Sequence, residues 1–420
     1  MLGLGEYAAR RSTGVFFSVL IGLTLAQMSQ SEEITTKHCA TTATAGLQSS
    51  AQLGCPLVID DGSQDCSPWT HQPECIESED GSGIKYCVFS NSQFGNQGVS
   101  IVTTPETAAS SVDILNDAGL SHVTNPWNQT QTPPYELFEH ASKGLGVRAT
   151  RPIPRASTIM TDWASVLLDL SFPTSVRRQH GYRLLHRAID QLADPDRILG
   201  LGRMPSSASP DLVENVVRTN AFTYHLGGDD GDSERPHAAV YADVARINHA
   251  CRPNAFVRWI PSSLAVRVVA ARDIAVGEEV TLSYIPQNHT RAERQASLRR
   301  WGFACACSLC SASKTEIAAS DYRRSKMRDL RAGVAEAIDA LDGTRAVRLT
   351  HEILELLRAE EIPSLYAGQY EILARLYGRA GDRETAARYA RISLETRIDQ
   401  GALDDRIEEY LPPLLATLDG

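Results

Sequence analysis

Three closely spaced cysteines in the second half of the chain could form one side of a metal site. Cys305, Cys307 and Cys310 lie within six residues of one another, and thiolates are common ligands of tetrahedral zinc. A fourth ligand must come from elsewhere, and Cys251 is the nearest cysteine. Disulfides are the alternative, but Cys305 and Cys307 are too close in sequence to pair easily. The spacing favours one zinc site made by these four thiols.

Two polar side chains stand just before Cys251. Asn248 and His249 lie in the segment 246–254, which reads Arg-Ile-Asn-His-Ala-Cys-Arg-Pro-Asn. Seen alone, an Asn-His pair is usually part of a turn. A zinc ion bound by Cys251 and the downstream thiols would tie this turn to the cysteine loop.

Four segments together resemble the SET-domain family of protein lysine methyltransferases. Residues 246–254 are similar to the Asn-His-x-Cys-x-Pro-Asn core of that family, and residues 277–284 to its Gly-Glu-Glu-x-Thr-x-x-Tyr strand. Residues 305–310 resemble its post-SET cysteine loop. Residues 143–154 supply the glycine segment that such a domain packs against the methyl donor; a lone Gly-x-Gly is a weak signal, but its order fits. The resemblance covers about residues 135–311.

The resemblance implies a role for each residue of the site. S-adenosylmethionine would be the methyl donor, and a lysine amine the acceptor. Tyr284 would be the catalytic residue, because its phenol stays neutral near pH 7 and can orient the amine and the departing methyl group. The residues implied to bind the donor are Gly144, Leu145, Gly146, Asn220, Asn248, His249, Tyr284 and Phe303, and those implied to bind zinc are Cys251, Cys305, Cys307 and Cys310.

The sequence departs from the family pattern at several positions. Ala156 stands where the family usually has glycine after Ile-Pro, and Asp162-Trp163 replaces a Glu-containing strand end. Ala250 replaces a common serine. Residues 219–223 resemble the Asn-x-Phe segment of the SET-and-MYND subgroup, although we find no MYND zinc module in the sequence. These departures bear on substrate and donor geometry and remove no named catalytic part.

Strands and helices must position these residues, and we expect a mixed α+β chain. Alternating patterns predict short strands within 135–170 and 255–270. Helical spacing predicts an insert over about 175–218. We therefore expect a β-rich SET fold with a threaded, pseudoknot-like C-terminus and a post-SET zinc loop over 135–311. A helical domain follows over 320–420; it resembles one tetratricopeptide helix pair, and packing helices are favoured over a peptide-binding groove.

The N-terminal part of the chain has sequence features typical of a targeting segment. Residues 1–26 read as a signal peptide, because Arg10 and Arg11 precede an apolar run too short for a comfortable membrane span. An uncleaved anchor or a wrongly assigned start are the alternatives. After cleavage we expect no stable membrane span. Asn128 and Asn288 lie in glycosylation sequons, although a glycan at Asn288 would crowd the site.

Residues 27–134 form a cysteine-containing region and linker. Behind a signal peptide, its five cysteines predict disulfides with one thiol left over. Zinc thiolates must stay reduced, whereas disulfides need an oxidising lumen; both can coexist if the metal binds first. We therefore expect the secretory pathway or the cell exterior, or the nucleus or cytoplasm if the signal is not used. These cysteines are Cys39, Cys55, Cys66, Cys75 and Cys87.

Length and charge set limits on partners. A chain of 420 residues is long enough for two or three folded units. Its formal net charge of -10 argues against direct binding of nucleic acid. An acidic surface could attract basic peptides such as histone tails, but it also serves solubility. The favoured function is S-adenosylmethionine-dependent methylation of a lysine in a protein or peptide. The alternatives are a zinc-binding SET-fold scaffold without turnover, or methylation of a non-histone protein or small amine.

Overall fold

The computed structural model describes residues 67–95, 97–116, 132–140, 143–202, 210–226, 235–260, 263–402 and 407–418. The expected signal peptide, the sequon at Asn128 and three cysteines, Cys39, Cys55 and Cys66, lie outside these ranges. Within them, no helix combines the length and the apolar character needed to cross a membrane.

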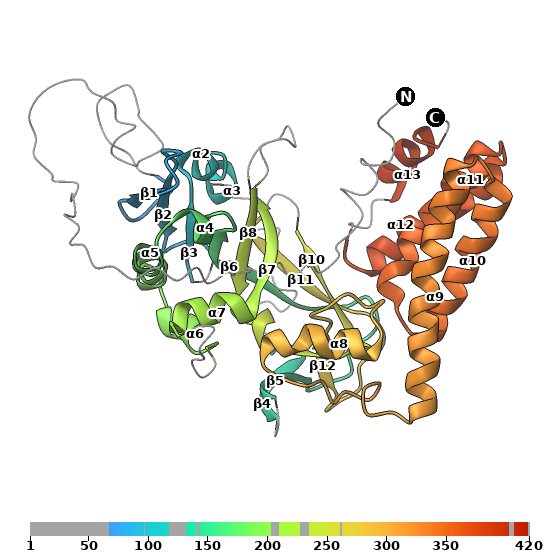
Figure 1. Ribbon diagram of the computed structural model, residues 1–420, viewed down its shortest axis with the longest axis horizontal. Helices are drawn as coiled ribbons and strands as arrows, with labels where there is room; N and C mark the ends of the chain where they lie inside the picture. Colours follow the sequence, from blue (N-terminus) through green and yellow to red (C-terminus); the bar gives the residue numbers. More distant parts are fainter. Residues whose placement is uncertain are drawn as a thin grey trace, which may run out of the picture.

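The larger of two sheets joins segments from the first two thirds of the chain (Figure 1). Its order is β1-β2-β3-β6-β11-β10, and β7 and β8 attach through the pairing of β8 with β6. The strands are β1 Glu74–Glu77, β2 Lys85–Asn91, β3 Val99–Thr103, β6 Thr158–Asp169, β7 Ala221–Leu226, β8 Arg235–Tyr241, β10 Ala255–Trp259 and β11 Ala265–Ala270.

The cysteine-containing region is continuous with this sheet. Strand β3 pairs in parallel with β6, so that Val102 lies opposite Leu168. Cys75 and Cys87 face each other on β1 and β2, with their Cα atoms 4.0 Å apart, and form a disulfide. The expectation of a disulfide in this region is confirmed at this pair. Strands from before and after the expected boundary at residue 134 thus lie in one sheet.

The smaller sheet brings together the motifs found in the sequence. Its order is β4-β5-β12-β9, so a strand from late in the sequence lies between two earlier ones. Strands β12 and β9 run parallel, with Thr281 opposite Asn248 and Leu282 opposite His249. The buried core that includes Leu282 also holds side chains of the larger sheet. The strands are β4 Tyr135–His140, β5 Gly144–Ala149, β9 Asn248–His249 and β12 Glu279–Leu282.

Short helices cover the larger sheet at the end that carries β1–β3 (Figure 1). The buried apolar side chains of the last four, α4 to α7, pack with Val88, Val102 and Val166 in a second apolar cluster, whereas those of α2 and α3 belong to the first. The helices are α2 Pro105–Ala109, α3 Val112–Asn116, α4 Phe172–Ser175, α5 Arg178–Asp190, α6 Pro195–Leu199 and α7 Leu212–Asn220.

The chain after the cysteine loop is helical in the described ranges. Helix α9 packs against α10, and α11 against α12, at the opposite end of the molecule (Figure 1). Both hairpins turn in the same way: Leu341 and Gly381 adopt positive φ, and the following Asp342 and Asp382 cap the next helix. Helix α8 Arg291–Leu298 precedes the cysteine loop, and the helices after the loop are α9 Lys314–Asp339, α10 Gly343–Ala359, α11 Tyr366–Arg379, α12 Arg383–Asp399 and α13 Ile407–Ala416.

The turn before β6 contains a strained alanine. Ala156 has φ of 65°, and its N–H donates to the carbonyl of Ala270 (2.9 Å). A residue with a Cβ atom is disfavoured in this left-handed conformation, whereas glycine is not. The family's preference for glycine at this position is therefore explained by the backbone conformation. Alanine at residue 156 lowers the stability of the folded protein relative to glycine.

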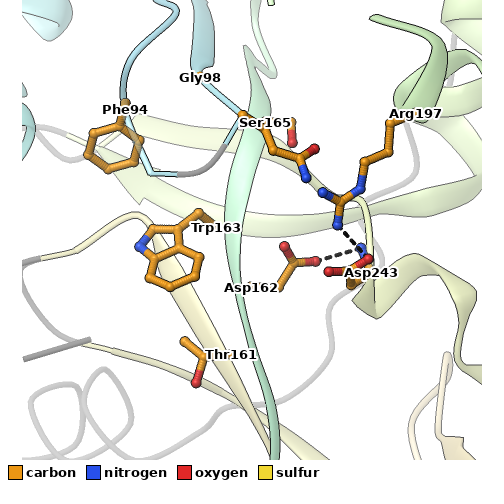
Figure 2. Close-up of a pocket in the computed structure, with 9 residues that line it drawn as sticks. Phe94, Gly98, Thr161, Asp162, Trp163, Ser165, Arg197 and Asp243 are labelled. Carbon is orange, nitrogen blue, oxygen red and sulfur yellow. Dashed lines mark hydrogen bonds and ion pairs between the residues drawn. The ribbon is translucent and has the colours of Figure 1, made fainter. Parts of the chain in front are cut away.

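Asp162 on β6 supports the turn that leads into β9. Its carboxylate accepts hydrogen bonds from the backbone N–H groups of Asp243 (2.7 Å) and Val244 (3.0 Å). The Arg197 guanidinium pairs with the Asp243 carboxylate beside it. All three side chains meet at a cavity of about 40 Å3, with Trp163 across from them (Figure 2). Burial raises the pKa of Asp162 to about 7, with a further contribution from Asp243.

We expect Ala156→Gly to raise the free energy of unfolding by about 0.5–1 kcal/mol, because glycine relieves the left-handed strain but adds entropy to the unfolded chain. Urea unfolding monitored by circular dichroism would measure it. Ala340→Gly is the matched control: Ala340 ends α9 with φ of -80°, so its replacement should give no gain. Equal effects at both positions would contradict the strain argument.

A second prediction concerns pH. The folded-state pKa of Asp162, about 7, lies above the value of 3.8 expected for an accessible carboxyl. The folded state therefore holds its proton more strongly, and Asp162 lowers stability progressively as pH rises from about 4 to 7. Asp162→Asn should thus be stabilising relative to wild type by between about 1 and 4 kcal/mol at pH 8, with the difference fading near pH 4.

The measurement is urea unfolding of the wild type and of Asp162→Asn between about pH 4 and pH 8. The exposed Asp190→Asn, which changes the net charge equally, should show no such trend. A difference between Asp162→Asn and wild type that stays constant with pH would contradict the assignment.

Candidate functional site

The parallel pair β9–β12 places Asn248 against the glycine segment. The Asn248 amide donates to the carbonyl of Leu145 (3.2 Å) and to the Glu279 carboxylate (2.9 Å). The other oxygen of Glu279 pairs with the Lys143 ammonium (2.6 Å). Lys143 and Glu279 both lie in the motifs quoted above, but neither was singled out as a site residue. Only the fold shows that they orient Asn248.

Gly146 is required by close packing. A Cβ atom at this position would lie 2.8 Å from the Asn248 amide nitrogen and 2.9 Å from a ring carbon of Phe138. Gly144 has φ of 77° and open space around it, and Leu145 between them is partly exposed. The segment is therefore exposed at Gly144 and Leu145, where a ligand could approach the backbone, and is packed against Asn248 at Gly146.

His249 is buried and held in one tautomer. The backbone N–H of Tyr284 donates to its Nδ1 atom (3.1 Å), so Nδ1 is an acceptor and the proton of the neutral ring lies on Nε2. Nε2 faces the Cys251 sulfur at 3.4 Å. Burial lowers the pKa of His249 to about 4, so the ring is neutral at pH 7.

Tyr284 follows β12 and points back to the same turn. Its hydroxyl donates to the carbonyl of Ile247 (2.6 Å), and its ring lies 5.4 Å from that of His249 and 5.9 Å from that of Trp301. The tyrosine is only half-buried, so a substrate could reach the phenol. Trp301 was not among the predicted residues. Its position two residues before Phe303 was the signal available in the sequence.

Side-chain bonds from Asn254 fix the turn that carries the Asn-His pair. The Asn254 oxygen accepts from the Thr281 N–H (2.8 Å), and its amide donates to the Glu279 carbonyl (2.9 Å). This last residue of the Asn-His-x-Cys-x-Pro-Asn segment therefore bonds to β12 on the other side of the turn. It was quoted as part of the motif, and the structure gives it a positioning role.

The four cysteines of the sequence prediction come together. Their sulfur atoms all lie within 4.8 Å of one another, and Cys251 is 3.5 Å from Cys310 and 3.9 Å from Cys305. Ligands of tetrahedral zinc with bonds of about 2.3 Å lie roughly 3.8 Å apart. The four thiols therefore fit a zinc ion in number, type and spacing.

The thiol cluster and the aromatic residues form one packed unit. Tyr284, Trp301 and Phe303 contact the buried cluster that contains Cys251, Cys305 and Cys310. The ring of Phe303 lies 6.4 Å from that of His249. The loop geometry thus brings Phe303 close to His249, and its role toward the adenine stays a prediction from the resemblance.

Asn220 is placed differently from the other predicted residues. It ends α7, and its amide donates to the carbonyl of Val216 (2.9 Å) and to the hydroxyl of Thr219 (2.8 Å). These contacts are local, and none of them reaches Asn248 or His249. Its role toward the donor stays a prediction from the resemblance.

Comparison with known proteins agrees with these motifs. Residues 144–285 match the SET domain family. The chain is 34% identical over 207 residues to histone-lysine N-methyltransferase set5 of Schizosaccharomyces pombe, covering 48% of this chain and 58% of the relative. It is 41% identical over 76 residues to histone-lysine N-methyltransferase SET5 of Meyerozyma guilliermondii, covering 17% and 16%.

A relative with a different name is also similar. N-lysine methyltransferase SMYD2-B of Danio rerio is 30% identical over 109 residues, which cover 26% of this chain and 24% of the relative. The chain thus spans between about a sixth and three fifths of the length of these relatives. The family match over residues 144–285 identifies a SET domain in the chain, and these relatives support a SET-domain lysine methyltransferase family for it.

Proposed function

We propose that this protein transfers a methyl group from S-adenosylmethionine to a lysine side chain of a protein substrate. The observation that carries the proposal is the convergence of Tyr284, the Asn248–His249 pair and the glycine backbone at 144–146 in one site. These come from segments up to 140 residues apart, and the structure gives each a fixed partner in the others.

The geometry fits the demands of this chemistry. S-adenosylmethionine, when bound, supplies the methyl group on a sulfonium. The protein must hold the amine, the methyl carbon and the sulfur in line, and such positioning lowers the barrier. The hydroxyl of Tyr284 is directed by its bond to Ile247, and the phenol oxygen can accept a hydrogen bond from the lysine amine. A partly dry channel beside a cation favours the neutral, nucleophilic amine.

Asn248, His249 and the backbone of residues 144–146 would hold the donor. The neutral His249 ring and the amide of Asn248 supply polar atoms that are nearly buried, and the missing side chain at Gly144, which has open space around it, leaves room for a ligand to approach the backbone. Phe303 would cover the adenine. Asn220 would add a contact at the methionine end, as the resemblance implies.

A histone tail is a reasonable substrate class. Two of the relatives named above are called histone-lysine methyltransferases, and the net charge of -10 suits a basic peptide. Those names also favour the nucleus or cytoplasm over the secretory pathway for this chain. A non-histone protein is the alternative, as the N-lysine methyltransferase relative suggests.

We further propose that Cys251, Cys305, Cys307 and Cys310 bind one structural zinc ion. All four positions would be filled by protein thiolates, which is typical of structural rather than catalytic zinc. Through the packing around Phe303 and Trp301, the metal would hold the aromatic wall of the site in place.

The function predicts a contrast between two variants. Asn248→Ala should weaken donor binding by roughly 1–3 kcal/mol, because buried polar groups lose a partner. Tyr284→Phe should bind the donor with nearly unchanged affinity and yet transfer methyl groups far more slowly, because only the hydroxyl is lost. Calorimetric titration with S-adenosylmethionine and mass spectrometry of methylated basic peptides would measure the two properties.

Tyr322→Phe is the matched control for the phenol, because Tyr322 is a 67% exposed tyrosine on α9 and its replacement should change neither property. A wild-type protein that binds the donor tightly but methylates no protein or peptide would favour the scaffold alternative. Unchanged donor affinity in Asn248→Ala would show that the donor is placed wrongly.

The zinc site predicts one tightly bound zinc per chain. Cys251→Ser should release the metal and increase hydrogen exchange in the loop 301–311, although Cys251 is more than 50 residues away in sequence. Elemental analysis and hydrogen-exchange mass spectrometry are the measurements. Ser308→Ala, an exposed change in the same loop, should keep the zinc. Disulfides among the four cysteines in protein from the native host, with no metal, would sink the assignment.

A further inference from the structure

A buried carboxylate links the first two helices after the cysteine loop. Glu360 follows α10, and none of its side chain is exposed. One oxygen accepts from the Ser320 hydroxyl (2.7 Å) and from Arg324 (2.8 Å). The other accepts from Arg323 (2.6 Å), and Arg252, next to Cys251, lies at 3.7 Å. The carboxylate is thus surrounded by donors from α9 and from the turn that carries the Asn-His pair.

Arg324 extends this cluster into the proposed active site. Its side chain is also fully buried. Beyond Glu360, the same guanidinium donates to the carbonyl of Cys251 (3.2 Å) and to the carbonyl of Gln287. Cys251 comes two residues after His249, and Gln287 three residues after Tyr284. Arg324 on α9 therefore bonds to the backbone just after His249 and to the backbone just after Tyr284.

The segment that follows Tyr284 has further contacts with the helical part of the chain. The Ser364 hydroxyl donates to the side chain of Gln287 (2.7 Å). Arg294 on α8, nearly fully buried, donates to the carbonyl of His289 (2.8 Å) and lies 3.7 Å from Asp321 on α9. The segment after Tyr284 is thus linked to the C-terminal helical part by the Gln287 side chain and, through Arg294, by Asp321.

The buried position of this pair needs a reason other than stability. Removing a guanidinium and a carboxylate from water is unfavourable, and apolar side chains of similar volume often stabilise a protein as well or better. What apolar side chains cannot supply is a rigid planar group that donates to three acceptors in fixed directions. The value of Arg324 therefore lies in the geometry that it imposes.

Charge gives a second reason for a cation here. Four thiolates around a zinc ion carry a net charge of minus two, and Arg324 approaches the cluster through the Cys251 carbonyl. Groups that surround the ligands of a metal in this way orient them and tune the metal's affinity. A neutral side chain in place of Arg324 would loosen the turn and leave the thiolate charge less compensated.

We propose that Arg324, oriented by Glu360, is a positioning residue of the site. Through the carbonyls of Cys251 and Gln287 it fixes the His249 turn relative to the Tyr284 segment, so that helices α9 and α10 complete the active site. The inference rests on the proposed function for its effect on methyl transfer, but not for its effect on zinc and donor binding.

The test compares two neighbouring arginines in the full-length chain. Arg324→Met removes the bonds to both carbonyls, while Glu360 keeps Arg323 and Ser320 as partners. Arg323→Gln is the matched control: it removes a bond to the same carboxylate, and among the described residues Arg323 has no hydrogen bond to Cys251 or Gln287. Arg324→Lys keeps the charge but cannot reproduce the planar fork.

Three readouts need no methyl transfer: release of zinc to a chromophoric chelator, calorimetric S-adenosylmethionine affinity, and hydrogen exchange at 247–254 and 284–290. We expect Arg324→Met to speed zinc release and weaken donor binding about ten- to hundredfold, as for other groups that orient metal ligands. Exchange should rise in both segments. Turnover should fall mainly in kcat, and Arg324→Lys should be intermediate. Arg323→Gln should stay within about twofold of wild type in all readouts, since among the described residues Arg323 bonds to Glu360 and not to the carbonyls of Cys251 and Gln287.

The proposal is overturned if folded Arg324→Met matches wild type in zinc release and donor affinity, or if Arg323→Gln has effects as large. If Arg324→Met does not fold, Arg324→Lys decides, because wild-type zinc release and donor affinity in that variant would also overturn it. A wild-type protein that binds zinc and donor without methylating any substrate would defeat the proposed function alone, and the first three readouts would still measure the positioning role.

Discussion

The pairing of β9 with β12 is the contact on which the site depends. It is short, and it joins two strands of which one has only two residues. Such a pair offers few ladder bonds, so the neighbouring contacts must add to it. The Ala250 N–H donates to the Leu282 carbonyl (2.9 Å), and Asn254 bonds to Thr281. Without this pairing, the Asn-His pair and the tyrosine that follows β12 would not meet.

Several different kinds of interaction hold the surroundings of this strand pair together. The glycine segment approaches from β5, where the absence of a side chain at Gly146 lets the strand pass close to Asn248. The thiols close the opposite side, and a metal there would bind the loop of Phe303 to Cys251. The buried pair of Arg324 on α9 and Glu360, which follows α10, bonds to the backbone that follows the Asn-His pair. Each contact joins parts of the chain that are far apart in sequence, so the site depends on the fold as a whole.

The N-terminal strands show that the described part of the cysteine-containing region belongs to the same fold. Because β3 pairs with β6, the buried side chains of Phe89 and Ile101 share a core with Val147 and Leu282. The Cys75–Cys87 disulfide lies at the far edge of that sheet. The disulfide and the four free thiols are therefore in different parts of one fold, which is compatible with different chemistry for each group.

The residue types and their order were enough to predict a SET domain, the set of four thiols that lie together, and the Asn-His and Tyr284 motifs, because methyl transfer and zinc binding of this kind would require particular side chains at nearly fixed local spacings. Ala156 was also noticeable as a departure, and its positive φ explains the family's preference for glycine. The tertiary structure alone decided which groups support the site. Lys143 and Glu279 orient Asn248, and Trp301 packs beside Tyr284. Arg324, 73 residues after Cys251, reaches the site from α9. No local pattern marks such partners, since a long-range contact depends on how the strands and helices pack and not on the sequence around either residue.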